Sequence, residues 1–252
     1  MIFDAHAHYN DEKFDEDRDT LLKNLNENGV EYIINNGTDL ESSVFSLRLA
    51  EKYPFIKAAV GFHPHECDKA TGSWLSQIAE LCKDKEHVKA IGEIGLDYYY
   101  DFTPRELQIA VFEKQLELAK ELDMPVVIHD RDAHGDTLEI LRKYRPKGLL
   151  HCFSGSLEML DEIINLGLYI SLGGAVTFNN AKKPLQTAAR VPLNRLLLET
   201  DAPYMTPVPF RGKRCDSSHI IYTARKIAEI RGIDVNELLK ITSENGKQLF
   251  NI

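Results

Sequence analysis

Cysteine and long apolar runs are scarce in this 252-residue sequence, and each shortage excludes a class of protein. The four cysteines form no CxxC pair, which argues against a structural zinc site and against a disulfide framework. No run of 18 apolar residues occurs, and the first residues lack the charged and apolar stretches of a signal peptide. We therefore expect a soluble, cytoplasmic protein that does not bind a membrane.

Basic residues are also in the minority. The sequence has 30 Lys and Arg against 39 Asp and Glu, which gives a formal net charge of -9. A chain of this charge has no general attraction for a polyanion, so a protein that coats DNA is excluded and any nucleic-acid contact must come from a local basic patch. Nothing in the sequence indicates an obligate protein partner.

Short β-rich apolar segments alternate with amphipathic helical patterns along the whole chain, which is typical of successive βα units and a parallel sheet. The predicted strands are 2–5, 32–36, 56–61, 88–93, 125–129, 148–152, 168–173 and 195–200. Eight such units and no Pro/Gly/Ser-rich linker predict a single-domain α/β protein over residues 1–252, a (β/α)8 TIM barrel. A doubly wound open sheet is the structural alternative.

The clearest predicted helix covers residues 104–122. Thr103 is a good N-cap, Pro104 suits the first turn, and apolar side chains recur at helical spacing from Leu107 to Leu122. Further helices are expected at about 218–231 and 234–243, after a long proline-rich loop that follows the eighth strand. Loops beyond barrel strands are where such folds hold their chemistry.

Polar residues that can bind metals stand at the ends of the predicted strands. In an extended chain, His6 and His8 project to the same side, because side chains alternate between faces. In a barrel the active site lies at the C-terminal ends of the strands, and buried carboxylates or imidazoles need a partner or a metal. The predicted metal ligands are His6, His8, Glu93, His129, His151 and Asp201.

Four imidazoles and two carboxylates provide enough ligands for two divalent ions, for which Mg, Mn, Zn and Co remain open. We expect Glu93 to bridge the ions, and Asp201 to bind one ion and accept a proton from the attacking water. This geometry predicts a metal-dependent hydrolase. His63 and His65 are expected beside the ligands or at the substrate phosphate, and His134 on the surface at the start of a helix.

Many motifs of the sequence, taken in order, resemble the TatD family of metal-dependent deoxyribonucleases in the amidohydrolase superfamily. They are DAHAH, GFHPH, GEIGLDYY, HDRDA, HCFSGS, SLGGAVTFNNAKK, ETDAPY, RGKR and TSENGKQLF. The resemblance covers essentially the whole chain. It implies the barrel fold, a two-metal centre with the ligands named above, and 3′ to 5′ exonuclease action on DNA, with single strands or 3′ ends as substrate.

Substrate contacts are expected from basic and aromatic residues of the loops. The basic residues could reach a phosphate, and the aromatic ones could stack on unpaired bases. The basic candidates are Arg131, Lys182, Lys183, Arg211, Lys213 and Arg214. The aromatic candidates are Tyr98, Phe178, Tyr204 and Phe210.

The sequence departs from the family pattern near the predicted substrate site. Cys215, Ser217 and Ser218 stand where an asparagine and then a proline are common, and Asp101 stands where a basic residue is common, which predicts a weaker phosphate contact. Two other functions stay open. One is an amidohydrolase that cleaves a small ester, amide or lactone, and the other is a binding protein with an inactive site, against which the complete ligand set argues.

Overall fold

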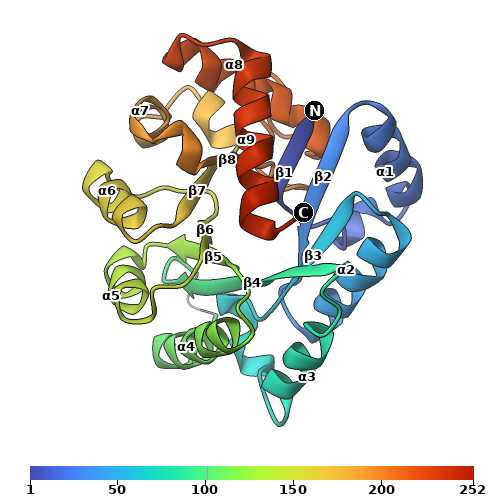
Figure 1. Ribbon diagram of the computed structural model, residues 1–252, viewed down its shortest axis with the longest axis vertical. Coiled ribbons are helices and arrows are strands. Elements are labelled where there is room, and N and C mark those ends of the chain that lie inside the picture. Colours follow the sequence, from blue (N-terminus) through green and yellow to red (C-terminus); the bar gives the residue numbers. More distant parts are fainter. Residues whose placement is uncertain (101) are drawn as a thin grey trace.

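The computed structural model describes residues 1–100 and 102–252, so the Asp101 prediction lies outside the described residues. Its strands form one parallel sheet in the order β1 to β8, and helices surround them as a ring (Figure 1). The strands are β1 (Ile2–Ala7), β2 (Val30–Asn36), β3 (Ile56–Val60), β4 (Val88–Asp97), β5 (Val126–Arg131), β6 (Gly148–Leu150), β7 (Tyr169–Leu172) and β8 (Leu196–Leu198).

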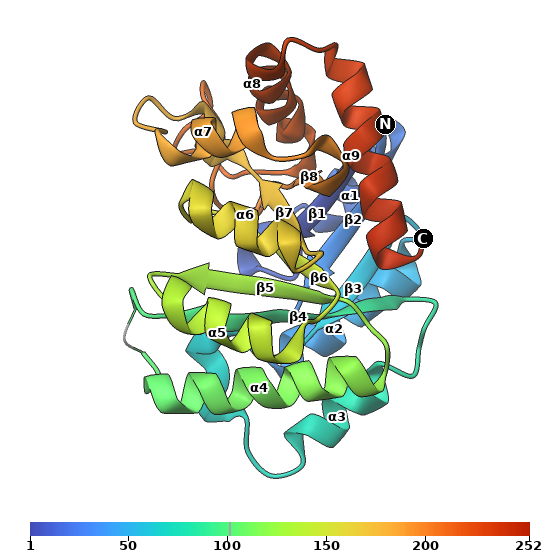
Figure 2. The same ribbon diagram turned by 60° about the vertical axis from the view of Figure 1, so that its left-hand side comes forward.

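Helices follow the strands on the outside of the sheet. They are α1 (Arg18–Glu27), α2 (Leu40–Lys52), α3 (Trp74–Leu81), α4 (Arg105–Glu121), α5 (His134–Tyr144), α6 (Leu157–Asn165), α7 (Lys183–Arg190), α8 (Ile220–Arg231) and α9 (Val235–Phe250). Short 3₁₀ helices lie at Glu12–Phe14, Pro64–Lys69, Gly174–Thr177, Leu193–Arg195 and Ser217–His219. Figure 2 shows α4 and α5 lying along β4 and β5. Among the described residues, no helix combines the length and the apolarity needed to cross a bilayer.

The sheet closes through the segment that follows β8. The backbone N–H of His8 donates to the carbonyl of Ala202 at 2.7 Å, and the N–H of Asp201 donates to the carbonyl of His6 at 3.0 Å. These bonds place the end of β1 beside the end of β8, as a barrel requires. The predicted TIM barrel is confirmed, and the open-sheet alternative is wrong.

Helix α9 covers the N-terminal end of the barrel, where Figure 1 shows it crossing in front of the strands. Its last residue, Phe250, stacks on Phe3 of β1 with ring centroids 6.0 Å apart. Gly246 allows this approach, because a Cβ there would lie 2.6 Å from the Phe3 ring. The helix predicted to end at residue 243 therefore continues to residue 250. The side of the helix that carries Gly246 packs against Phe3 at the N-terminal end of the barrel.

Helix α4 begins as predicted but differs in detail. Thr103 is not its N-cap: its hydroxyl donates to the carbonyl of His65 at 3.2 Å, and Pro104 occupies the cap position. Leu107 is exposed, whereas Gln108 and Gln115 are fully buried. The two side-chain amides form hydrogen bonds with backbone groups: Gln108 with Asp97, and Gln115 with Phe62. Buried backbone groups require hydrogen-bond partners, and the apolar pattern of the sequence does not show which side chains provide them.

Candidate metal centre

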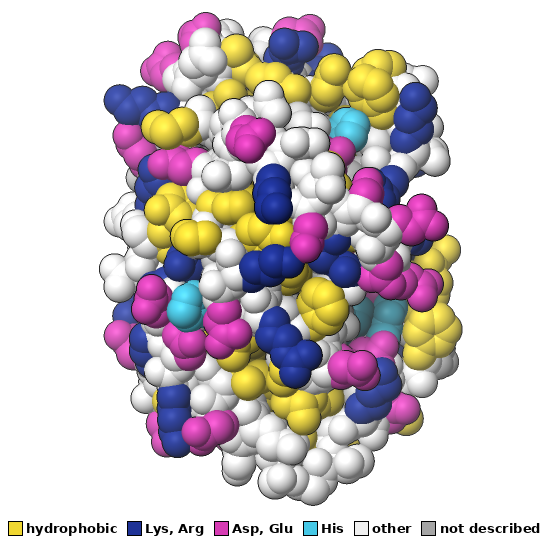
Figure 3. All heavy atoms as spheres, turned by 90° about the vertical axis from the view of Figure 1, so that its right-hand side faces the viewer, with side chains coloured by type: hydrophobic (Ala, Val, Ile, Leu, Met, Phe, Trp, Pro, Cys, Tyr) yellow, Lys and Arg dark blue, Asp and Glu magenta, His cyan; other side chains and the backbone are white. Residues whose placement is uncertain are grey.

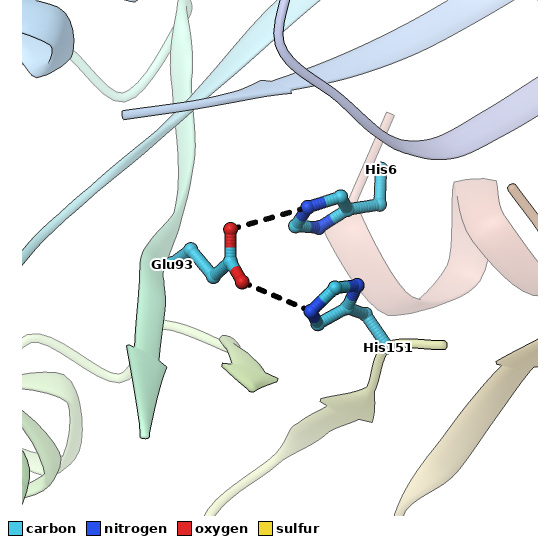
Figure 4. A group of neighbouring side chains, drawn as sticks. All are labelled: His6, Glu93 and His151. Atoms are coloured by element: carbon cyan, nitrogen blue, oxygen red, sulfur yellow. Dashed lines mark ion pairs between the residues drawn. The ribbon is translucent and has the colours of Figure 1, made fainter. Parts of the chain in front are cut away.

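Glu93 of β4 lies at the centre of the C-terminal end of the barrel, with imidazoles on both sides of its carboxylate. Its Oε2 lies 3.3 Å from Nε2 of His6 and 3.3 Å from Nε2 of His8. Its Oε1 lies 2.8 Å from Nδ1 of His129 and 2.9 Å from Nε2 of His151. Figure 4 shows His6 and His151 directed at the two different oxygens. The carboxylate thus separates two clusters of nitrogen atoms.

Asp201 completes the cluster on the β1 side. Its Oδ1 lies 3.7 Å from Nε2 of His6 and 3.6 Å from Nε2 of His8. Three sets of donor atoms lie within 4.8 Å of one another, namely His6–His8–Asp201, His6–Glu93–His151 and His63–Glu93–His129. The structure therefore brings all six predicted ligands together and places His63 beside them.

The hydrogen bonds at the outer ring nitrogens leave lone pairs facing the centre. Nδ1 of His8 donates to the carbonyl of Asn36 at 3.0 Å, so its Nε2 is free. This Nε2 lies 2.9 Å from Nε2 of His6, and Nδ1 of His6 has no partner among the described residues. Two nitrogen atoms this close, both buried, fit a shared cation, and imidazole and carboxylate donors suit a divalent metal.

Burial and neighbouring charges set the ionisation of this centre. Burial, with the charge of His151, lowers the pKa of His6 to about 4, so its ring is neutral at pH 7. Burial opposes ionisation of Glu93, but the surrounding histidines, His151 first, hold its pKa well below its usual range. Burial raises the pKa of Asp201 to about 6. The same carboxylates raise the pKa values of His8, His129 and His151 against the effect of burial. A bound metal would displace these protons, because metals bind neutral imidazoles and ionised carboxylates.

Asp97, the last residue of β4, contacts two histidines of the centre and is not among the residues predicted from the sequence. Its Oδ2 accepts from Nε2 of His129 at 3.0 Å and lies 2.9 Å from Nε2 of His65. A carboxylate behind a metal-binding imidazole fixes the ring and its tautomer. Its spacing of four residues from Glu93 suits one face of a strand, but the sequence pattern predicts that the strand ends at residue 93.

Glu199, which follows β8, is a second buried carboxylate that the sequence reasoning missed. Its Oε2 accepts from the hydroxyl of Ser171 at 2.5 Å and lies 3.8 Å from Nδ1 of His151. Glu199 lies behind His151 as Asp97 lies behind His129, but at a distance too long for the hydrogen bond that Asp97 makes. Only its place before Thr200 and Asp201 at a strand end could have indicated it.

His63 differs from the other histidines in its hydrogen bonding. The backbone N–H of His65 donates to Nδ1 of His63 at 3.1 Å, so the proton of the neutral ring is on Nε2. Burial lowers the pKa of His63 well below its usual range. Its Nε2, 3.5 Å from Oε1 of Glu93, is therefore a hydrogen-bond donor that faces the centre.

The centre opens into a cavity of about 670 Å³. Its carboxylates outnumber its cations, since Asp11 and Glu66 add to the buried acids and Arg131 is the basic side chain among the described lining residues. At the right-hand edge of Figure 3, histidine side chains lie in a hollow between acidic and hydrophobic side chains. Bound divalent ions would offset this concentrated negative charge.

The predicted basic contacts are divided between the cavity and the surface. Arg131 lines the cavity, with its guanidinium 4.0 Å from the ring centroid of Tyr99. Arg214 forms an ion pair with Asp17 at 2.6 Å, and Arg211 stacks on Phe178. The described cavity lining includes none of Lys182, Lys183, Arg211, Lys213 and Arg214.

The predicted aromatic contacts are divided in the same way. Tyr204 lines the cavity, and its hydroxyl donates to Asp11 at 2.7 Å. Tyr98 donates to Asp136, and Phe210 packs edge-on against Tyr222. Two aromatic residues that were not singled out, Tyr100 and Phe102, line the cavity instead. His134 begins α5 as expected, and Asp130 contacts its Nδ1 at 2.6 Å.

Comparison with known proteins yields a consistent set of relatives. The family model described as TatD related DNase matches residues 3–251. The uncharacterized metal-dependent hydrolase YabD of Bacillus subtilis is 43% identical, and the alignment covers 100% of both chains. The 3′-5′ ssDNA/RNA exonuclease TatD of Pectobacterium parmentieri is 34% identical, also over 100% of both.

Solved structures show the same fold. The crystal structure of YJJV, a TatD homologue from Escherichia coli, superimposes with a TM-score of 0.93 at 33% identity, covering 100% of this chain and 98% of the other. The phosphotriesterase homology protein from Escherichia coli, at 16% identity and a TM-score of 0.68, covers 99% and 98% of the two chains and shows the fold alone.

Proposed function

Since this chain belongs to the TatD-related DNase family of metal-dependent hydrolases, which act on ester bonds, we propose that it is a 3′ to 5′ exonuclease that removes nucleotides from single-stranded DNA. We further propose that it uses two divalent metal ions. The observation that carries the proposal is the position of Glu93, whose two carboxylate oxygens face separate clusters of imidazole nitrogens.

The ligands divide naturally between two ions. His6, His8 and Asp201 would hold one ion, and His129 and His151 the other, with Glu93 shared. When bound, the ions would polarise a phosphoryl oxygen and stabilise the negative charge that develops on it. The outer nitrogens of His8 and His129 are held by Asn36 and Asp97, so these rings need little reorganisation to bind.

Three side chains would act on the attacking water or on the substrate. The carboxylate of Asp201, whose pKa burial raises to about 6, would accept a proton from the attacking water. Nε2–H of His63 would donate to a phosphoryl oxygen, because its proton faces the centre. Arg131 would bind a phosphate at the cavity mouth.

A small ester, amide or lactone is the second candidate substrate. The observation that favours it is the acidic lining, because Asp11 and Glu66 at the cavity would repel the further phosphates of an extended polyanion. Hydrolysis of a small neutral substrate would use the same ions and the same Asp201.

The test uses one single-stranded oligonucleotide labelled at the 3′ end in one sample and at the 5′ end in another. Protein loaded with Mg²⁺ or Mn²⁺ is expected to release nucleotides stepwise from the 3′ end. EDTA and Glu93→Gln should abolish release, whereas Glu80→Gln, an exposed glutamate of α3, should not change it. Metal binding without DNA cleavage, together with hydrolysis of an ester or lactone panel, would establish the second candidate instead.

A further inference from the structure

Two aromatic rings at the mouth of the cavity have much of their surface exposed. Tyr100 is 39% exposed and Phe102 is 69% exposed, although both line the cavity that contains Glu93. Their ring centroids are 5.3 Å apart and their planes differ by 13°, so they stack on each other. Exposed, stacked rings beside a polar cavity contribute little to the fold and present an aromatic surface to whatever enters.

The backbone that carries Tyr100 is held in place by hydrogen bonds. Oδ1 of Asp97 accepts from the backbone N–H groups of Tyr99 and Tyr100, both at 3.0 Å. The buried amide of Gln108 donates to the carbonyls of Asp97 and Thr103, at 3.0 and 2.9 Å. Both sides of the aromatic pair are thus attached to the barrel.

The rings are also connected to the metal centre and to a cation. The ring of His65 meets Tyr100 and Phe102 edge-on, with centroid distances of 5.4 and 5.0 Å. The guanidinium of Arg131 lies 4.8 Å from the centroid of Tyr100. An aromatic surface, a cation and a hydrolytic centre therefore border one cavity, which is the combination that a nucleotide requires for its base and its phosphates.

We propose that Tyr100 and Phe102 form a stacking platform for an unpaired base near the 3′ end of the substrate, with Arg131 on an adjacent phosphate. The proposal rests on the proposed nuclease function. Stacking on aromatic rings tolerates any base, because every base has a π face. A base in a duplex end must leave its pair and its stack to reach the platform, at a cost in free energy, so the platform favours single-stranded ends. A hydrophobic protein surface is a poorer occupant, because the rings border charged and imidazole groups.

The experiment compares two single-stranded oligonucleotides that differ in their last two nucleotides, which are normal in one and abasic in the other. Metal-loaded wild-type protein is expected to show a KM about tenfold lower for the normal end, since stacking on an aromatic side chain commonly contributes a factor of this size. The double variant Tyr100→Ala/Phe102→Ala should raise KM for the normal end about tenfold and leave KM for the abasic end unchanged.

Two further variants separate stacking from a general effect on the fold. Tyr100→Phe keeps an aromatic ring and should behave as wild type. Leu107→Ala removes another exposed apolar side chain, on α4, and should change neither KM.

The outcomes separate the platform from the nuclease function. The platform would be overturned if wild-type protein cleaved both oligonucleotides with equal KM, or if the double variant raised KM equally for both. Either result would leave the nuclease function in place. Failure of wild-type protein to cleave either oligonucleotide would overturn the nuclease function and the platform together.

Discussion

Oδ2 of Asp97 lies 3.0 Å from Nε2 of His129, on the side of the ring opposite to Glu93. Because a carboxylate is an acceptor only, this contact keeps a proton on Nε2, so in the neutral ring that binds a metal the lone pair of Nδ1 faces the centre. Asp97 and Glu93 together hold the pKa of His129 above its usual value against the effect of burial. The orientation of His129 toward the centre thus depends on a residue that contacts the other nitrogen of its ring.

Asp97→Asn should weaken the centre without removing a ligand. The amide can still accept from the backbone of the Tyr99–Tyr100 turn, but it loses the charge that orients His129 and His65. We expect metal affinity or activity to fall about 10- to 100-fold, as is usual for such supporting carboxylates. Isothermal titration calorimetry with Zn²⁺ measures the metal affinity of the variant and of the wild type. An unchanged affinity would show that Asp97 has no part in positioning the ligand.

Arg131 and Arg211 should differ in their effect on substrate binding. Arg131 lines the cavity, whereas Arg211 stacks on Phe178 outside its described lining. Arg131→Gln should raise KM for an oligonucleotide about tenfold, the size of one hydrogen bond to a charged group, and Arg211→Gln should raise it far less. Steady-state kinetics at one salt concentration provide the comparison. A larger increase in KM for Arg211→Gln than for Arg131→Gln would indicate that DNA binds over the loop after β8.

Gly246→Ala should destabilise the fold. A Cβ at this position would lie 2.6 Å from the ring of Phe3, so α9 or the ring must move, at a cost of about 1–3 kcal/mol in the free energy of unfolding. Gly135→Ala on α5 is the matched control, because no atom lies within 4 Å of a Cβ there. It should stabilise the protein by up to about 1 kcal/mol. Urea unfolding in EDTA measures both, and equal effects would contradict the packing of α9.

His134 should make stability depend on pH. Its hydrogen bond to Asp130 raises its pKa above the ordinary value of 6.5, against the effect of burial. The folded state therefore holds this proton more tightly than the unfolded state. The stabilisation is complete below pH 6.5 and is lost as the pH rises through the raised pKa.

His134→Gln removes this dependence. In urea unfolding with EDTA present, the variant should be less stable than wild type at pH 5.5, and the difference should shrink at pH 9. A difference that is constant with pH would show that the contact with Asp130 contributes no proton-linked stability.

The fold and much of the centre could be predicted because they follow local rules. Eight apolar runs separated by helical patterns indicate the barrel, and polar residues at strand ends such as Glu93 and His151 meet once the strands close. The ends of β4 and α9 could not be predicted in the same way, and both elements extend beyond the predicted residues. Asp97 and Gly246 belong to these elements because of what packs beside them, and their own residue types give little sign of it.

The substrate side depends on contacts between distant parts of the chain. The RGKR motif suggests a phosphate site, but its Arg214 forms an ion pair with Asp17, almost 200 positions earlier in the chain. Tyr100 and Phe102 line the cavity because Asp97 and Gln108 hold their loop there. Neither relationship is visible as a local pattern, which is why the predicted ligands lie together while the predicted substrate contacts are scattered.

The most direct test of a bridging role for Glu93 is a crystal grown with Mn²⁺, with anomalous scattering recorded to locate the metal. Two peaks about 3.5–4 Å apart are expected, as in other two-metal hydrolytic sites, one beside Oε1 of Glu93 and the other beside Oε2. A single peak, or two peaks that leave one oxygen of Glu93 without a metal, would contradict the proposal that this carboxylate bridges two ions.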